Sequence, residues 1–253
     1  MSDRSRVHIT IYGRRAVLEA LTEPNVEVEA IAVDSGTPGS FRTELADAAA
    51  RHDVTVEKAS RDRITSLSGD RRNDQGVVAR IRLRGVMDDE GFTAGLTGAK
   101  ARTPTRVLAL DNVTNPQNVG MIVRSAVAGG MQGMLWPEVG TPWVSGLIIK
   151  ASASTIYRCP IVRCHALLDG LWTFKQRGFT LIGLEAGGSE SVLTHEPPHR
   201  VVYVVGGETH GISDDVLDVL DGRVHIPMAN DVESLNAAVA ASLVCFRVGS
   251  VGA

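Results

Sequence analysis

The stretch RVLALDNVTNPQNVGMIVRSAVAGG, residues 106–130, joins a short apolar run to a periodic apolar segment through a polar loop. The run at 106–111 predicts a buried strand, because it is apolar over the length of a strand. The segment 116–128 has apolar residues at the spacing of one helix face: Val119, Ile122, Val123, Ala126 and Val127. Asn115 fits the N-cap of this helix, and Gly129 fits its end. The stretch therefore predicts a strand, a loop and a helix, the building unit of α/β proteins.

Arg124 lies on the flank of this helix, about 140° from Val119, since successive helix residues are about 100° apart. Most charged side chains face solvent, so a surface position is one interpretation. The alternative is a cation at a ligand site, because α/β proteins bind ligands where parallel strands end in loops. The segment by itself leaves both interpretations open.

The chain beyond residue 105 repeats this alternation. Strands are expected at 106–111, 133–136, 161–163, 179–184, 201–206 and 223–226. Helices are expected at 116–128, 144–156, 166–177, 213–220 and 234–248. This order predicts an α/β domain with a mostly parallel sheet that helices cover on both faces.

The first 84 residues predict a smaller α/β domain. Helices are expected at 13–21, 40–52 and 61–67, and strands at 28–33, 54–57 and 76–83. Residues 85–105 have no amphipathic period and contain four glycines and Pro104, so they predict a linker. The expected domains are therefore 1–84 and 106–253.

The composition, with 43% hydrophobic and 22% charged residues in 253, is typical of globular proteins. The longest apolar runs are shorter than the ~18 residues that indicate a membrane span, and no apolar signal-peptide core follows the first residues. We therefore expect a soluble, cytoplasmic protein with no membrane association. The chain has three cysteines, Cys159, Cys164 and Cys245, and no two of them form a Cys-x-x-Cys pair. This predicts reduced thiols and neither a disulfide framework nor a zinc ribbon.

The chain has a net charge of −3 but contains one strongly basic segment. Residues 58–84 hold three acidic and eight basic side chains, the basic ones being Lys58, Arg61, Arg63, Arg71, Arg72, Arg80, Arg82 and Arg84. This basic stripe could follow a phosphate backbone, or it could be a solvated face of strand and loop.

The segment HEPPH, residues 195–199, has the letter pattern of a zinc protease site, in which both histidines lie on one helix face. Pro197 and Pro198 exclude that helix, because two consecutive prolines break it. We expect a surface turn here and no metal site.

The segment VVYVVGGETHGIS, residues 201–213, runs from a buried strand into a glycine-rich loop and then into a helix capped by Ser213. Glycines allow a ligand to approach the backbone closely. The dinucleotide fingerprint G-x-G-x-x-G is absent. The loop is either a ligand site that carries Glu208 and His210 or a tight turn with an exposed acid.

The last helix is expected to be capped by Ser234 and to be slim, since it contains several alanines. Its predicted core stripe is Leu235, Val239, Leu243 and Phe246. A slim helix permits close helix packing or a nearby ligand.

Three motifs now occur in a fixed order: N-x(5)-R at 118–124, G-G-E-x-x-G at 206–211 and I-P-M-x(5)-S-L-N at 226–236. Together they resemble the SpoU/TrmH branch of the SPOUT methyltransferases, over essentially all of 106–248. Residues 150–154, before Pro160, also resemble a stretch of this family. The resemblance implies methyl transfer from S-adenosylmethionine to a ribose 2′-hydroxyl of RNA, a deep trefoil knot in the SPOUT domain, and a homodimer.

The amino-terminal part resembles the L30e-like substrate-binding domain of the ribosomal RNA subgroup, through residues 11–21 and 74–79. This resemblance implies that the partner is RNA, with 23S ribosomal RNA as the expected substrate. The resemblance also implies that the basic stripe binds RNA.

The resemblance implies a cofactor site at Gly206, Ile226 and Leu235, with help from the loop near Glu185. It implies catalytic roles for Asn118, Arg124, Glu208, Ser234 and Asn236. An arginine with a pKa above about 12 is a poor base, so we expect Arg124 to bind phosphate and to stabilise the developing alkoxide. Asn118 and Glu208 would orient Arg124, while Ser234 and Asn236 would shape the acceptor pocket.

The sequence departs from the family pattern at Gly207, at Ala237-Ala238, at Asp74 and at Ser154. None of these departures removes a proposed catalytic side chain. They leave two alternatives open, which are a tRNA 2′-O-methyltransferase and a non-catalytic RNA-binding or ribosome-assembly protein of the same fold.

Overall fold

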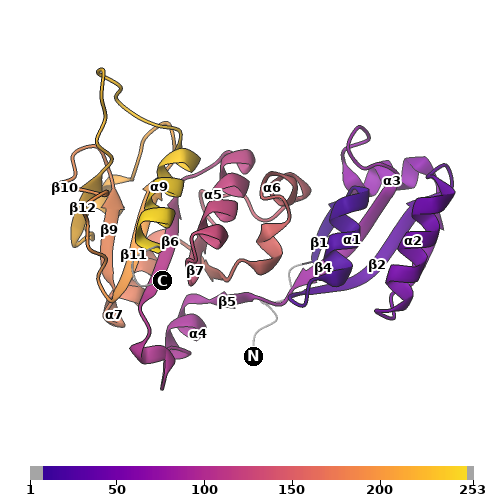
Figure 1. Ribbon diagram of the computed structural model, residues 1–253, viewed down its shortest axis with the longest axis horizontal. Coiled ribbons are helices and arrows are strands. Elements are labelled where there is room, and N and C mark those ends of the chain that lie inside the picture. The colour runs from indigo at the N-terminus through magenta and orange to yellow at the C-terminus, as the bar shows by residue number, and fades with distance from the viewer. Residues whose placement is uncertain (1–7, 250–253) are drawn as a thin grey trace. The chain divides into compact units, whose positions relative to one another are not determined.

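Figure 1 shows the computed structural model of the chain, which describes residues 8–249. The contacts within the chain divide it into two units. One unit comprises the chain up to Gly85 together with Val144–Arg158, and the other comprises Val86–Trp143 and the chain from Cys159 onward.

The first unit contains a four-stranded sheet in the order β1-β4-β2-β3, antiparallel except for the parallel pair of β2 and β3. Its strands are β1 (His8–Tyr12), β2 (Val26–Asp34), β3 (Val56–Ala59) and β4 (Val77–Leu83). Its first helices are α1 (Arg14–Thr22), α2 (Gly39–Ala50) and α3 (Arg61–Ser68). These elements confirm the predicted α/β unit and add β1, which was not predicted because five residues give little periodicity.

The segment 144–156 was predicted as one helix of the second domain, but by its contacts Val144–Arg158 belongs to the first unit. It forms the short helix α6 (Gly146–Ala151) and the 3-10 turn η3 (Thr155–Arg158). The Tyr157 hydroxyl donates to the Ala16 carbonyl oxygen at 3.4 Å, and α6 contacts β1. A Cβ on Gly146 would lie 2.4 Å from the ring of Tyr12, so the absence of a side chain there permits this packing.

The second unit contains an eight-stranded, fully parallel sheet in the order β10-β12-β9-β11-β6-β7-β8-β5. The strands are β5 (Val86–Asp88), β6 (Thr105–Asp111), β7 (Gly133–Pro137), β8 (Ile161–Cys164), β9 (Thr180–Leu184), β10 (Glu190–Ser191), β11 (Arg200–Gly206) and β12 (Gly222–His225). All six strands predicted after residue 105 are present. The predicted α/β class with a parallel sheet is confirmed.

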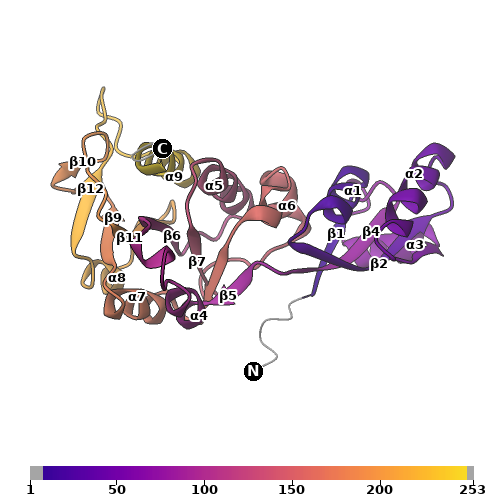
Figure 2. The ribbon, with the colours of Figure 1, turned by 60° about the horizontal axis from the view of Figure 1, so that its bottom comes forward.

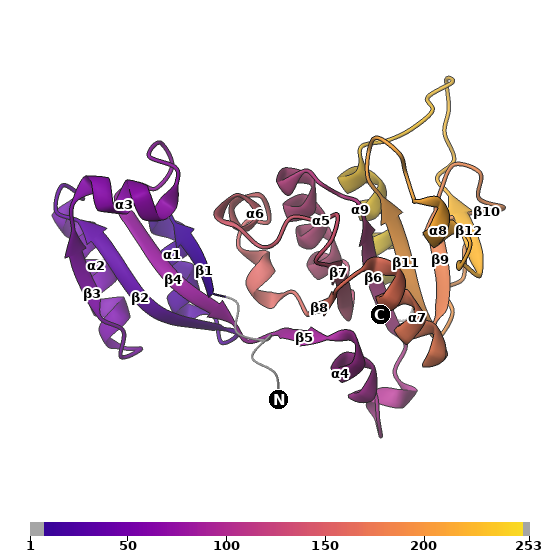
Figure 3. The ribbon, with the colours of Figure 1, turned by 180° about the vertical axis from the view of Figure 1, so that it is seen from behind.

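Helices cover both faces of this sheet (Figure 2). On one face lie α5 (Pro116–Ala128) and α9 (Ala237–Gly249), which contact each other. On the other face lie α4 (Asp89–Ala94), α7 (Leu167–Gln176) and α8 (Asp214–Leu217) (Figure 3). Helix α5 has the predicted bounds, and the Asn115 side chain caps it by accepting from the backbone N–H of Gln117 at 2.9 Å.

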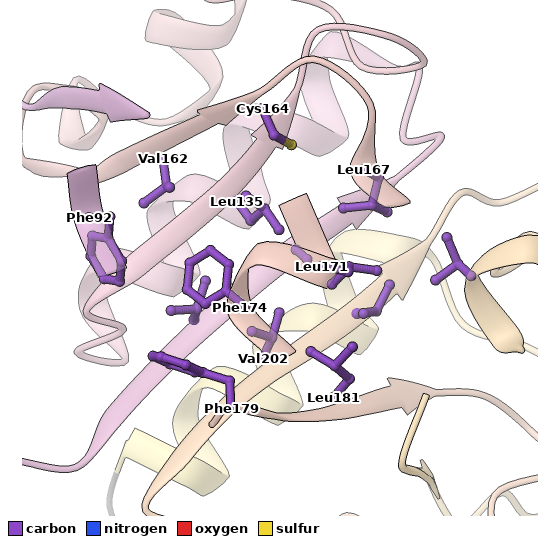
Figure 4. Packing of buried hydrophobic residues seen from close by; sticks show 14 of the residues in the cluster. Phe92, Leu135, Val162, Cys164, Leu167, Leu171, Phe174, Phe179, Leu181 and Val202 are labelled. Atoms are coloured by element: carbon purple, nitrogen blue, oxygen red, sulfur yellow. The ribbon is translucent and has the colours of Figure 1, made fainter. Parts of the chain in front are cut away.

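The core beneath α7 is built around three aromatic rings (Figure 4). Phe174 meets Phe179 edge to face at 4.8 Å between ring centroids and meets Phe92 at 5.7 Å. Phe92 belongs to α4, within the predicted linker, so residues 85–105 contain a strand, a helix and part of the core. Elements of three and six residues are too short for a periodic signal.

Helix α9 differs most from its prediction. Its buried side chains are small or medium, namely Ala237, Ala238, Ala241, Val244, Cys245 and Val248. The predicted core stripe is exposed instead, with relative exposures of 49% at Val239 and 55% at Phe246. The reason is close approach to the end of α5, because a Cβ on Gly129 would lie 2.8 Å from the backbone of Cys245.

The segment that contains His195 was predicted as a surface turn, but His195 is buried. Its ring nitrogens bond Glu190 at 2.8 Å and the Tyr203 hydroxyl at 3.0 Å. All three cysteines are buried free thiols, and burial raises their pKa to about 12. Over residues 8–249, no helix is both long enough and apolar enough to cross a bilayer.

Candidate functional site

The candidate site lies where the adjacent parallel strands β6 and β11 end. Asp111 and Gly206, the last residues of these strands, are paired in register. The loop after β6 leads into α5, and the loop after β11 is the glycine-rich segment. Residues from both loops therefore meet at the carboxyl edge of the sheet, where α/β folds bind ligands.

A cavity of about 280 Å³ opens at this edge, which we call the first cavity. Its lining includes all three predicted cofactor residues: Gly206, Ile226 and Leu235. Other residues of the lining are mostly apolar or glycine, and three are carboxylates, namely Glu185, Glu208 and Glu233. An apolar cavity with a few polar groups is the usual form of a small-molecule site.

Close backbone packing shapes the glycine-rich loop. A Cβ on Gly206 would lie 2.1 Å from the carbonyl carbon of Gly211, and one on Gly207 would lie 2.3 Å from the carbonyl oxygen of Asn112. Gly211 also has φ +67°, in the left-handed region that favours glycine. The loop therefore folds against itself and against the β6 loop, in a way that side chains at these glycines would prevent.

Three of the predicted catalytic side chains bond to one another. The Asn236 amide nitrogen Nδ2 donates to Asn118 Oδ1 at 3.1 Å and to the Glu208 carboxylate. The Asn236 oxygen accepts from the backbone N–H of Ala238 at 2.9 Å. We call Asn118, Glu208 and Asn236 the polar cluster. It joins all three motifs at one place.

The cap of α9 is Asn236 and not Ser234 as predicted, because α9 begins at Ala237 and Asn236 satisfies its first free N–H groups. Ser234 is exposed and contributes to the lining of the first cavity. Ser234 therefore lies at the predicted site but does not cap α9.

Arg124 lies outside the polar cluster. It is exposed, and its side chain makes no hydrogen bond, ion pair or ring contact within residues 8–249. The expected contacts of Asn118 and Glu208 with Arg124 are not seen, because Asn236 bonds both of those side chains. The guanidinium thus stays open to solvent in the second half of α5.

Asp111 is a residue of the site that the motifs did not indicate. It is buried, and its carboxylate accepts from the Ser213 N–H at 2.6 Å, from the Ser213 hydroxyl at 2.8 Å and from Asn112 Nδ2 at 2.9 Å. Ser213 occupies the predicted cap position of α8, but its hydroxyl bonds Asp111 in place of the helix. The available signal was an acid as the last residue of a buried strand.

The basic stripe of the first unit is largely ion-paired. Arg80 Nε lies 2.9 Å from Glu29 Oε2, and Arg82 and Arg84 both pair with Glu27 on the neighbouring strand. These pairs lie across the backbone pairing of β4 with β2. Within residues 8–249, the stripe's side chains without an ion-pair partner are Lys58, Arg63 and Arg72.

Asp74, one of the departures from the family pattern, is accommodated by hydrogen bonds inside the first unit. Its fully buried carboxylate accepts from Arg61, from the Ser68 hydroxyl at 3.1 Å and from the Gly76 N–H at 2.9 Å. Arg61, which is only partly buried, is thereby bound to a buried carboxylate of the first unit. In residues 8–249 no group of three or more His, Cys, Asp or Glu side chains is placed to hold a metal ion.

Comparison with known proteins identifies both parts of the chain. Residues 105–246 match the SpoU rRNA Methylase family, and residues 10–84 match the family described as RNA 2′-O ribose methyltransferase substrate binding. A Mycobacterium avium (strain 104) protein named "Uncharacterized tRNA/rRNA methyltransferase" is 34% identical over 240 residues, which are 94% of this chain and 76% of that protein.

Solved structures have the same fold. The SpoU methyltransferase AviRb from Streptomyces viridochromogenes, in complex with AdoMet, aligns with a TM-score of 0.78 at 22% identity, over 97% of this chain and 90% of that one. An AdoMet-bound rRNA methyltransferase from Sinorhizobium meliloti aligns with a TM-score of 0.74 at 20% identity, over 95% and 86%. With a family match over more than half its length and a relative above 30% identity, the chain belongs to the SpoU family of RNA methyltransferases.

Proposed function

We propose that this protein transfers a methyl group from S-adenosylmethionine to a ribose 2′-hydroxyl of RNA, and that the RNA is 23S ribosomal RNA. The observation that carries the proposal is the polar cluster, which joins the three motifs beside a cavity lined by Gly206, Ile226 and Leu235. The description of the substrate-binding family and the AdoMet-bound relatives support it.

The first cavity suits this cofactor in shape and charge. Gly206 and Gly207 expose backbone to the cavity, and Ile226 and Leu235 provide apolar surface for an adenine ring. The lining includes three carboxylates and neither lysine nor arginine. A cavity of negative charge favours a cation, and S-adenosylmethionine supplies its methyl group from a positively charged sulfur.

The protein's own part in the reaction is orientation and electrostatics. Methyl transfer requires the ribose oxygen in line with the methyl group, so positioning supplies much of the acceleration. Asn236, fixed between Asn118 and Glu208, and the neighbouring Ser234 shape the acceptor position in our proposal. Arg124, whose guanidinium is open to solvent, binds the RNA phosphate and stabilises negative charge on the 2′-oxygen as that oxygen loses its proton to water and accepts the methyl group.

The proposal extends to the rest of the molecule. In this proposal the first unit binds RNA, and the second unit, which includes β5 and α4, forms the catalytic domain. We place the protein in the cytoplasm. The trefoil knot would lie in the carboxyl-terminal part, where the chain leaves β12 near one edge of the sheet and returns as α9 against α5, β6 and β11 in its middle.

We also propose that the protein acts as a homodimer through α9. Val239, Leu243 and Phe246 are exposed on this helix, and Met121 of the adjoining α5 is 42% exposed. Soluble proteins seldom leave a continuous apolar surface uncovered. A second copy of the chain would cover it.

Two measurements on the purified protein test the proposed activity. Calorimetric titration with S-adenosylmethionine should show binding, and tritium-labelled methyl groups should pass to 23S ribosomal RNA from cells that lack the protein. Transfer to tRNA instead would contradict the assigned substrate. Absence of cofactor binding would contradict catalysis itself and favour an RNA-binding role.

A further inference from the structure

A second cavity, of about 350 Å³, adjoins the first. It lies between the loop after β6 and the loop after β11, and its lining shares Gly207, Glu208 and Gly211 with the first cavity. The loop that carries Glu208 is therefore a common wall. Two ligands that occupied the two cavities would meet at Glu208 and the adjacent Asn236.

The chemistry of the second cavity differs from that of the first. Its lining contains the side-chain amides of Asn112 and Asn115, the hydroxyls of Thr114 and Thr209, and the imidazole of His210. Neither lysine nor arginine belongs to it. With the Asn118 amide and the Glu208 carboxylate of the same lining, these groups offer the donors and acceptors that bind the edges of nucleobases.

The walls of the second cavity are held in place by Asp111. Its backbone oxygen accepts from the Gly207 N–H at 2.9 Å, while its carboxylate holds Ser213 at the other end of the same loop. Asn112, next in the chain, has φ +52° and bonds that carboxylate. The two loops are thus fastened to each other at Asp111, and Thr209 and His210 lie on the segment between the two fastened points, Gly207 and Ser213.

We propose that the second cavity receives the nucleobase of the acceptor nucleotide, turned out of the RNA stack, and that Thr114, Thr209 and His210 read its edge. The proposal rests on the proposed methyl transfer to RNA. With the base in the second cavity and the cofactor in the first, the ribose of the same nucleotide lies at the common wall. Enzymes that do chemistry on a base take it out of the stack in this way, and our proposal extends this to an enzyme that acts on the ribose.

The test uses synthetic RNA oligonucleotides that carry the acceptor site mapped in ribosomal RNA, made in four versions that differ only in the acceptor base. The wild-type protein should prefer one base in kcat/KM. A well-placed pair of hydrogen bonds discriminates between bases by about tenfold to a hundredfold. His210→Ala and Thr209→Val should each lose about tenfold of that preference, while the Kd for S-adenosylmethionine stays within about twofold.

The matched control is His165→Ala, because His165 is an exposed histidine outside both cavities. It should retain the wild-type base preference. Equal activity of the wild type on all four RNAs, or an unchanged preference in both cavity variants, would overturn the inference and leave the methyltransferase assignment standing. A wild-type protein that binds no S-adenosylmethionine and methylates none of the RNAs would instead overturn the proposed function, and the inference with it.

Discussion

At the scale of single residues, the site separates a fixed part from an open part. The polar cluster is fixed, since Asn236 bonds Asn118, Glu208 and the first turn of α9. Arg124 has no such partner within residues 8–249. We therefore propose that the polar cluster positions the acceptor nucleotide and that Arg124 supplies positive charge to the phosphate and the 2′-oxygen.

Arg124→Ala removes the charge that we propose for the 2′-oxygen and the RNA phosphate. Loss of one group that stabilises transition-state charge costs about a hundredfold to a thousandfold in rate. We expect that loss in single-turnover methylation, with the Kd for S-adenosylmethionine within about twofold. Arg177→Ala, at an exposed arginine beyond α7, is the control. Wild-type turnover by Arg124→Ala would remove the arginine from the mechanism.

Asn236→Ser separates the two tasks of Asn236. A serine keeps an oxygen that caps α9, so the free energy of unfolding should change by less than about 1 kcal/mol. It loses the N–H donor to Asn118 and Glu208, and methyl transfer should fall by about a hundredfold, as for a misplaced substrate. Thermal unfolding and single-turnover rates measure the two effects. Unchanged transfer would show that the polar cluster does not position the acceptor.

At the scale of elements, long periodic segments were predictable from the sequence and short ones were not. Helix α5 was predicted with its bounds and cap, because its apolar positions recur over more than three turns. Strand β5 and helix α4 were missed, since three and six residues give no period. The orientation of α9 was wrong, because hydrophobicity points its large side chains inward, while close packing against α5 requires the small ones.

The same limits apply to the site. The motifs indicated Asn118, Glu208 and Asn236, which do meet. The motifs could not show that Asn236 would bond both partners and leave Arg124 outside, because that depends on where α9 begins. Asp111 belongs to no motif, and its only signal in the sequence was an acid at the end of a buried strand.

Close packing of α9 on α5 gives a prediction for stability. Ala241 is fully buried in α9, and a larger side chain there should force the helices apart. Ala241→Leu should lower the free energy of unfolding by about 1–3 kcal/mol. Ala128→Leu, the same substitution at an exposed position of α5, should change it by less than about 0.5 kcal/mol. Urea denaturation measures both, and equal effects would contradict the packing argument.

At the scale of the whole molecule, the exposed apolar side of α9 leads to a prediction of assembly. Leu243→Glu combined with Phe246→Glu places charges where a second copy would pack. Light scattering after gel filtration should give a dimer for the wild type and a monomer for this variant. The exposed pair Asp214→Lys and Asp215→Lys, on α8 at the other face of the sheet, should leave the dimer intact. A monomeric wild type would refute the homodimer.

The measurement that tests the central claim most directly is a map of ribose methylation in ribosomal RNA from cells with and without this protein. Our account predicts that one 2′-O-methylated nucleotide of 23S ribosomal RNA disappears in the cells that lack the protein, and that it returns with the wild-type chain but not with Arg124→Ala. An identical methylation map in the two kinds of cell would contradict the account.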